Sequence, residues 1–286
     1  MIYGLGAALV WGFADLFAAI VGRRIGSART LAIAQVAGLC VVGIVAVVVH
    51  PSLDLSRSQL VGLVANGLVV TVAYITLYRG LELGPVALVS PVAAAYAAIT
   101  IGLAIVFLNE SLAGWVLAGA LVTLVGVALT STDPRELTTA RSDPGERPSG
   151  VPWGLAAMAT FGVSTFVLAQ YARDLGWLLP VLVTRCTTTA AVLLWMVAFR
   201  PEPGRGVSFG PAIGAILIGA VDVFGILMYA RGVQLGLVTI VAAASATFPI
   251  VSVLGGVLIL RERPALSQSV GVVLVIGGLL TLALSR

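Results

Sequence analysis

The sequence has no lysine, one histidine and two cysteines, and charged residues make up only 10% of its 286 residues. All 16 basic residues are arginines near the ends of apolar runs or in connectors, apart from Arg185, so the net charge of +4 does not indicate nucleic-acid binding. Cys40 and Cys186 have neither pairing nor metal-site spacing. No P-loop, HExxH or GxSxG motif and no Asp-rich cluster occurs, which argues against ATP hydrolysis and against an enzyme. We expect no metal and no cofactor.

Apolar residues make up 59% of the chain and the mean hydropathy is +1.11, far outside the range of soluble domains. Most of the ten apolar runs have the roughly 20 residues that a helix needs to cross about 30 Å of hydrocarbon. They are apolar all round, whereas barrel strands would alternate apolar and polar residues. The sequence therefore predicts an all-α integral membrane protein with ten transmembrane helices. The predicted spans are 2–20, 31–49, 60–78, 85–108, 114–130, 152–171, 178–199, 213–229, 237–260 and 270–284.

The two halves of the chain overlay without a gap at an offset of 152 residues. Over the 65 positions from Gly62 to Gly126, about one coincidence of glycines is expected by chance, and six occur. Each half has five spans, an odd number, so the second half must enter the bilayer from the opposite face. The sequence predicts two inverted five-helix repeats, 1–131 and 151–286, joined by a linker loop at 132–150 that is rich in Thr, Ser, Pro and charge.

The arginines are distributed unevenly between the two faces. Ten are assigned to the face opposite the termini and five to the face of the termini, with Arg185 inside a span; moving Arg79 gives eleven against four. The positive-inside rule then predicts that both termini lie outside a plasma membrane or cell inner membrane. No basic residue precedes the first span and no small-x-small cleavage site closes it before Arg23, so we expect it to remain in the mature protein.

Several motifs recur in both halves. In the first half they are Trp11-Gly12, the 78–85 turn (YRGLELGP), Leu108-Asn109-Glu110, and Gly119 with Gly126; in the second half they are Phe161-Gly162, the 231–236 turn, Phe248-Pro249, Leu260-Arg261-Glu262, and Gly271 with Gly278. This arrangement resembles the EamA-type repeat of the drug/metabolite transporter superfamily and covers nearly the whole chain. The resemblance implies ten helices, alternating access and a small-molecule cargo of unspecified class. Many members have cytoplasmic termini, from which the arginine count departs.

Three ionisable side chains lie well inside predicted spans: Asp15, Arg185 and Asp222. Each costs about 2.5–3.5 kcal/mol near the bilayer centre and therefore needs a reason. Neutralisation of either aspartate by a proton is energetically realistic, so both are candidates for proton coupling. The alternative is a structural aspartate paired with Arg185 or bonded to a backbone carbonyl. Arg185 itself is more typical of a structural residue that reaches toward the interface.

Aromatic and small polar side chains share helix faces with these acids and predict a cavity with few polar anchors. Such a cavity suits a small amphipathic amine, amino acid or drug-like metabolite, and a ring beside an acid favours an organic cation. Ordinary interhelical packing is the alternative for any one ring. The predicted cavity residues are Trp11, Asp15, Asn66, Tyr74, Tyr96, Phe161, Ser164, Thr165, Asp222, Tyr229 and Thr247.

Pro91 and Pro249 interrupt the fourth and ninth spans and are predicted hinges, at positions that are not equivalent in the overlay. Glu110 and Glu262 each precede another helix and are expected to cap its N-terminus.

Taken together, the sequence favours a secondary active transporter that exports small metabolites or drugs by alternating access with proton coupling. Its partners would be a small-molecule substrate, protons and the lipid bilayer. The alternatives are a facilitator or exchanger without proton coupling, and a non-transporting membrane sensor.

Overall fold

Helices make up most of the described part of the chain, which in this computed structural model comprises residues 1–83, 86–110, 113–130, 150–199, 207–251 and 266–284. Those residues contain no strand, so the all-α prediction is confirmed for them. Six of the helices are long and apolar enough to cross a membrane, and four shorter apolar stretches accompany them. The helices are α1 (Ile2–Ile25), α2 (Ser27–Val49), α3 (Arg57–Leu83), α4 (Val86–Ala94), α5 (Tyr96–Phe107), α6 (Gly114–Thr130), α8 (Val151–Leu175), α9 (Leu178–Phe199), α10 (Phe209–Leu235), α11 (Val238–Ser245) and α13 (Leu266–Ala283). The predicted linker lies outside the described residues except for Gly150.

Local sequence signals account for several helix ends. Before α3, the backbone N–H of Ser56 donates to Gln59 Oε1 (2.9 Å) and that of Gln59 donates to Ser56 Oγ (3.2 Å), a reciprocal capping box. Between α1 and α2 the chain turns at Gly26, whose φ of 93° strongly favours glycine. The turn after α8 uses Gly176 with φ 82°, so each half makes its first helix–helix turn in the same way.

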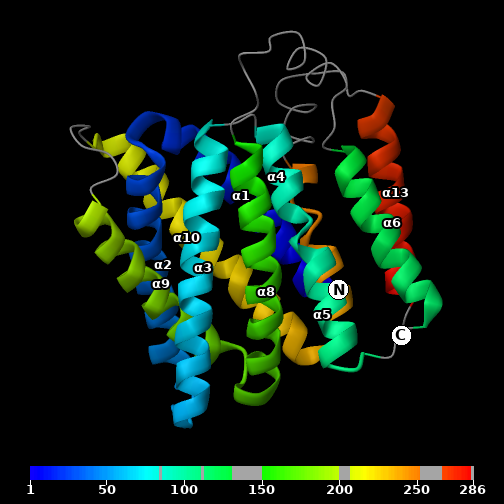
Figure 1. Cartoon of the computed structure of the whole chain (residues 1–286), viewed down its shortest axis with the longest axis horizontal. Helices are drawn as coiled ribbons and strands as arrows, with labels where there is room; N and C mark the ends of the chain where they lie inside the picture. The colour runs from blue at the N-terminus through cyan, green and yellow to red at the C-terminus, as the bar shows by residue number, and fades with distance from the viewer. Residues whose placement is uncertain (84–85, 111–112, 131–149, 200–206, 252–265, 285–286) are drawn as a thin grey trace.

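The two halves of the chain interlock rather than stand side by side. In Figure 1, α1 and α2 of the first half lie among α9 and α10 of the second, and α6 lies along α13. The largest contacts outside the α6–α13 pair join α1 to α10 and α3 to α8. Because these pairs cross between halves, the interior is shared by both.

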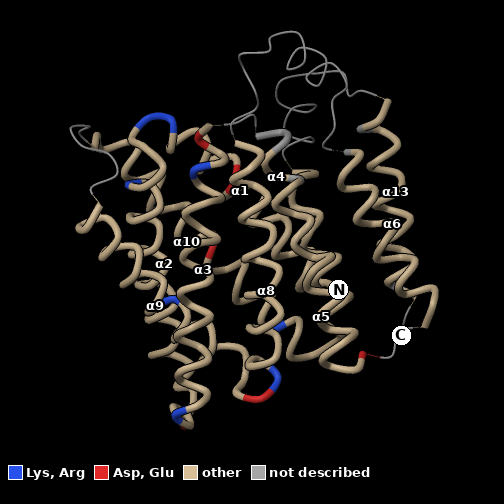
Figure 2. The backbone as a smooth tube through the Cα atoms, in the orientation of Figure 1, with Lys and Arg blue, Asp and Glu red and all other residues tan. Residues whose placement is uncertain are grey.

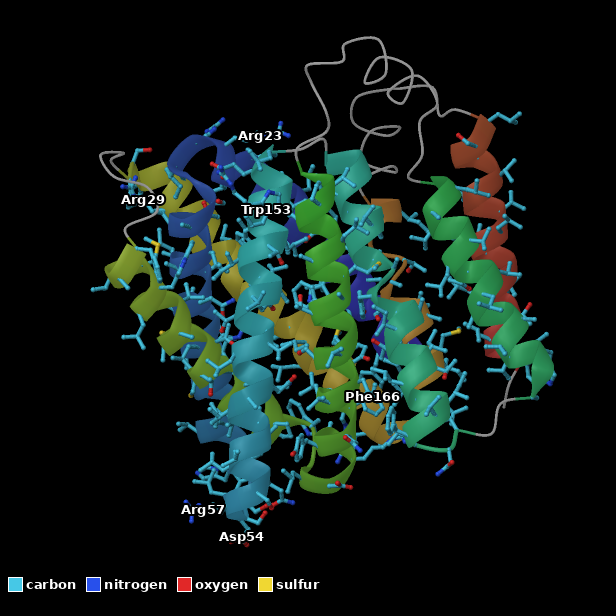
Figure 3. All side chains as sticks on the ribbon, in the orientation of Figure 1. Arg23, Arg29, Asp54, Arg57, Trp153 and Phe166 are labelled. Carbon is cyan, nitrogen blue, oxygen red and sulfur yellow. The ribbon has the colours of Figure 1, made fainter. Side chains whose placement is uncertain are left out.

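The first helices of the halves run in opposite directions. Figure 3 labels Arg23, near the end of α1, and Trp153, near the start of α8, at the same end of the molecule. Arg57 and Asp54, just before α3, are labelled at the other end. We call these the Arg23 end and the Arg57 end.

Two helices break at equivalent places in the two halves. The first break is at Ala95, between α4 and α5, where the Ala95 N–H donates to Val92 O. The second follows Ser245, where the Thr247 N–H donates to Ala244 O. Each of these donors and acceptors lies 152 residues from its counterpart. Pro91 lies four residues before the first break and Pro249 two residues after Thr247, so both prolines adjoin a break although their own positions do not correspond.

Glycines bring helices of opposite halves close together in matched pairs. A Cβ at Gly12 would lie 2.5 Å from Phe248 O, and one at Gly162 would lie 3.1 Å from Tyr96 O. Phe248 follows Tyr96 by 152 residues and Gly162 follows Gly12 by 150. At these distances any larger residue would force the helices apart, so both contacts depend on glycine.

Candidate functional site

A cavity of about 70 Å³ lies between the halves, lined by side chains from both. Alanines of α1 and α4 line this space together with aromatic rings of α1, α3, α5 and α8. The lining residues are Trp11, Ala14, Asp15, Ala18, Tyr74, Leu77, Tyr78, Ala93, Tyr96, Phe161, Thr165, Asp222, Ile226 and Phe248. We call this space the main cavity.

Asp15 provides the main cavity with a buried acid. It is 8% exposed, and its Oδ2 accepts a hydrogen bond of 2.9 Å from Ser90 Oγ on α4. Among the described residues no ion pair involves Asp15, whereas Glu82, Glu110 and Asp222 each have an arginine partner. A buried carboxylate without a counter-charge is costly, so this group favours either a proton or a cationic ligand.

Asp222 belongs to a charged cluster that ties four helices together. Arg185 Nη2 on α9 donates to Asp222 Oδ2 at 2.5 Å, and Arg185 Nη1 donates to Gln35 Oε1 on α2 at 2.7 Å. The hydroxyl of Tyr74 on α3 donates to both oxygens of Asp222, at 3.1 and 2.9 Å. The guanidinium carbon of Arg185 also lies 5.6 Å from the centroid of the Tyr74 ring. Unlike Asp15, Asp222 is therefore matched by a buried cation.

A second space of about 40 Å³ adjoins the main cavity and shares Tyr74, Phe161, Thr165 and Ile226 with it. We call it the side pocket. Its remaining wall comes from α3, α8 and α9 and includes five polar side chains. The side pocket is lined by Asn66, Val70, Tyr74, Phe161, Ser164, Thr165, Leu168, Val181, Thr184, Arg185, Thr188 and Ile226.

Most residues expected at a cavity do line one of these two spaces. Trp11, Asp15, Tyr96 and Asp222 line the main cavity; Asn66 and Ser164 line the side pocket; Tyr74, Phe161 and Thr165 line both. Two lie elsewhere. Tyr229 is fully buried, with its ring centroid 6.0 Å from that of Trp11. Thr247 donates its hydroxyl to Ala244 O within the helix break.

Sequence reasoning missed several residues that complete the site. Tyr78 lines the main cavity one helical turn after Tyr74, a spacing that could have identified it. Ser90 and Gln35 have no such signal, because they meet Asp15 and Arg185 only through contacts between distant helices. Thr184 and Arg185 belong to the side pocket, where Arg185 is buried rather than directed toward an interface.

Glu110 ties the halves together at the Arg57 end. Its Oε1 accepts from Arg173 Nη2 (2.6 Å) and from the backbone N–H of Val238 (2.8 Å). Its Oε2 accepts from the backbone N–H (3.2 Å) and the hydroxyl (2.9 Å) of Thr239. Glu110 therefore caps a helix N-terminus, but of α11 in the other half rather than of the helix that follows it. Glu262 lies outside the described residues.

At the Arg23 end, a vestibule of about 240 Å³ is lined by Ser27, Tyr78, Arg79, Trp153 and Trp195 among others. Tyr78 also lines the main cavity, so it separates the two spaces. Ser27 Oγ and Arg79 Nη1 both donate to Glu82, which places Arg79 at this end. With Arg79 at this end, the alternative count applies, in which eleven arginines are assigned to the face opposite the termini and four to the face of the termini. Figure 2 shows that charged residues gather at the two ends of the helices, with few between.

The sequence matches a known protein family, and the fold matches a solved structure. The model of the EamA-like transporter family matches residues 1–132 and 148–284. No curated protein matches. One solved structure, titled only as the crystal structure of a protein, aligns over 99% of this chain and 96% of its own with a TM-score of 0.76 at 19% identity. At that identity the likeness shows a shared fold.

Proposed function

The chain belongs to the EamA-like transporter family, within the drug/metabolite transporter superfamily, and is a multi-pass membrane protein; from this premise we propose that it is a proton-coupled exporter of small organic molecules. The observation behind the proposal is the buried acid Asp15, which has no counter-charge among the described residues and lies in an aromatic cavity between the two halves.

Three features expected of an inverted repeat support alternating access. Helices α1 and α8 run in opposite directions, the helix breaks fall at equivalent places, and the glycine contacts occur in matched pairs. Four pairs of related residues line the main cavity: Tyr74 with Ile226 and Tyr96 with Phe248 at the offset of 152, and Trp11 with Phe161 and Asp15 with Thr165 at an offset of 150. A cavity between related halves can be exposed to either side when one half moves against the other.

Transport is coupled to protons because a proton and a cationic substrate compete for the same carboxylate, that of Asp15. Asp15 releases a proton when a cationic substrate enters the main cavity and takes one up after the substrate leaves. Asp222 is the second proton site, because protonation would release it from Arg185. Rings around Asp15 favour an amine or another organic cation. At about 70 Å³ the main cavity is smaller than the roughly 300 Å³ of ligand pockets, so this conformation must widen to admit such a molecule.

The arrangement of arginines favours a cytoplasmic Arg23 end. With the Arg23 end in the cytoplasm, the vestibule opens toward the cytoplasm and the Glu110 contacts close the outer side. An alkaline phosphatase fused after Arg286 should then be active in cells. If this fusion and a second one in the connector before Arg57 are both inactive, the termini lie in the cytoplasm and the assignment is reversed.

The coupling test uses proteoliposomes that contain an internal pH dye and a panel of amines, amino acids and sugars. A substrate-evoked pH change is expected for the wild type and for Asp54→Asn, a control acid that is exposed in the connector before α3. Asp15→Asn should abolish the pH change, and Asp222→Asn should reduce or abolish it. Uptake of labelled substrate without any pH change in the wild type would instead show a facilitator or exchanger and refute proton coupling.

A further inference from the structure

The side pocket contains buried polar atoms that have no hydrogen-bond partner among the described residues. They are both amide atoms of Asn66, a residue 4% exposed, and the hydroxyl of Thr184, which is 8% exposed. Buried polar groups in proteins nearly always have a partner in the protein, in ordered water or in a ligand. The side pocket is therefore arranged to receive an occupant that forms hydrogen bonds.

The charge of the side pocket indicates the chemistry of that occupant. Arg185 lines the pocket and is 5% exposed. A guanidinium has five N–H donors, so its contacts with Gln35 and Asp222 leave capacity for another acceptor. The Asn66 amide and the Thr184 hydroxyl add two uncharged donors. A buried cation with converging donors suits a hydrogen-bond-accepting anion.

We propose that the side pocket is a binding site for one small anionic group, either a carboxylate on the transported molecule or a free halide. At about 40 Å³ the side pocket is small, which favours a carboxylate or a halide over larger anions such as sulfate or phosphate. Because the side pocket shares four lining residues with the main cavity, a carboxylate on a molecule held at Asp15 needs only a rearrangement of that shared wall to reach it.

Asp222 is the built-in competitor for this site. It occupies Arg185 Nη2 in the present structure, and a second anion beside both groups would leave the cluster negative. When Asp222 takes up a proton, which rests on the proposed function, Arg185 is left uncompensated and the anion replaces the aspartate. Tyr74 is the other titratable group of the cluster, and Asp15 and Tyr78 lie across the main cavity. Anion binding is thus linked to protonation of Asp222.

Binding can be measured on the purified full-length chain by thermal unfolding in detergent. Sodium chloride and sodium acetate are compared with sodium gluconate, whose anion is too large for the pocket, at equal ionic strength. We expect chloride or acetate to raise the unfolding temperature in a saturable way. Thr184→Val should weaken this binding about tenfold through the loss of one hydrogen bond to a charge. Thr187→Val is the matched control, because the Thr187 hydroxyl bonds Val183 O in its own helix and does not line the pocket.

Asp222→Asn gives the sharper result, because removal of the competitor should strengthen anion binding at least tenfold. If that variant does not fold, Asn66→Leu provides a second test in the weakening direction. A saturable effect of chloride or acetate supports a site that accepts free ions. No effect of either salt, but stabilisation by glycine betaine and not by choline, supports a carboxylate on the transported molecule.

The proposal is overturned if none of these probes stabilises the protein, or if Thr184→Val and Thr187→Val respond alike. Its failure would not be confused with failure of proton coupling. Coupling is measured in proteoliposomes through Asp15, whereas anion binding is measured without a membrane gradient through Thr184.

Discussion

At the scale of single residues, the Arg185–Asp222 pair places two opposite charges in the interior. Both members are taken from water into a helical core, and their mutual attraction must offset that desolvation. Tyr74 and Gln35 supply the additional hydrogen bonds that such a pair needs. The pair therefore depends on four helices at once, and loss of one member leaves the other charge unmatched.

This dependence predicts non-additive mutational effects. Arg185→Met or Asp222→Leu alone should lower the free energy of unfolding by about 3–5 kcal/mol, because each leaves a buried charge without its partner. The double variant R185M/D222L should recover most of that loss while remaining inactive in transport. Denaturant unfolding followed by tryptophan fluorescence would measure the cycle. A double variant as unstable as the sum of the single variants would show that the two side chains act independently.

The role of a single residue could be predicted only where its neighbours in the sequence were enough to indicate it. Asp15 stood out because an acid in an apolar run is costly wherever it points. The partners Ser90 and Gln35 did not, since a serine or glutamine in a membrane helix has many uses. Tyr229 was expected at the cavity because it shares a helix face with Asp222, yet it lines neither space and its ring centroid lies 6.0 Å from that of Trp11. Composition identifies candidate residues, whereas the packing of the helices decides which of those residues face the cavity.

At the scale of elements, glycines set how closely α2, α3, α9 and α10 approach one another. A Cβ on Gly219 of α10 would lie 2.0 Å from the backbone oxygen of Ala34 on α2, where neither group can rotate away. On the first half's side, Gly67 of α3 meets Thr184 O and Thr187 of α9 in the same manner. Both contacts flank the Arg185 cluster, so helix spacing there also fixes the charged site.

Gly219→Ala should therefore destabilise the protein by about 1–3 kcal/mol, the usual cost of overpacking, and should lower transport. Gly43→Ala on α2 is the matched control, because a Cβ there would meet nothing within 4 Å. That variant should be neutral or slightly stabilising, since alanine favours a helix over glycine. Unfolding of the two variants side by side is the measurement, and equal stability of both would refute the close approach.

Helices were predicted well where the length of an apolar run defines them, and less well where a helix is broken. All-round apolar runs gave the six long helices with ends that differ from the predicted ones by at most six residues. The helix breaks were expected at the prolines themselves. They lie instead beside them, at Ala95 and at Thr247, because a missing N–H weakens the adjoining turn and packing then selects the residue at which the chain bends.

At the scale of the whole molecule, alternating access requires the closed end to open. The contacts of Glu110 link the end of α8 and the start of α11 to the first half. Above them, the hydroxyls of Tyr96 and Ser245 lie 2.7 Å apart and join α5 to α11 beside the main cavity. These two layers join the halves at the Arg57 end, and in the proposed mechanism they must separate for that end to open. The sequence could not have shown them, because their members come from segments more than 60 residues apart.

Glu110→Gln should loosen this closure, because it removes the charge that holds Arg173 and the N-terminus of α11. Ser245→Cys, in a background in which Cys40 and Cys186 are replaced by alanine, reports the change. A membrane-impermeant thiol reagent added from the Arg57 end should modify that cysteine several-fold faster when Glu110→Gln is present. Glu82→Gln is the control, since it removes the ion pair with Arg79 at the opposite end. Equal modification rates in both backgrounds would mean that the Arg57 end is held closed by its apolar packing, and that Glu110 contributes to helix capping alone.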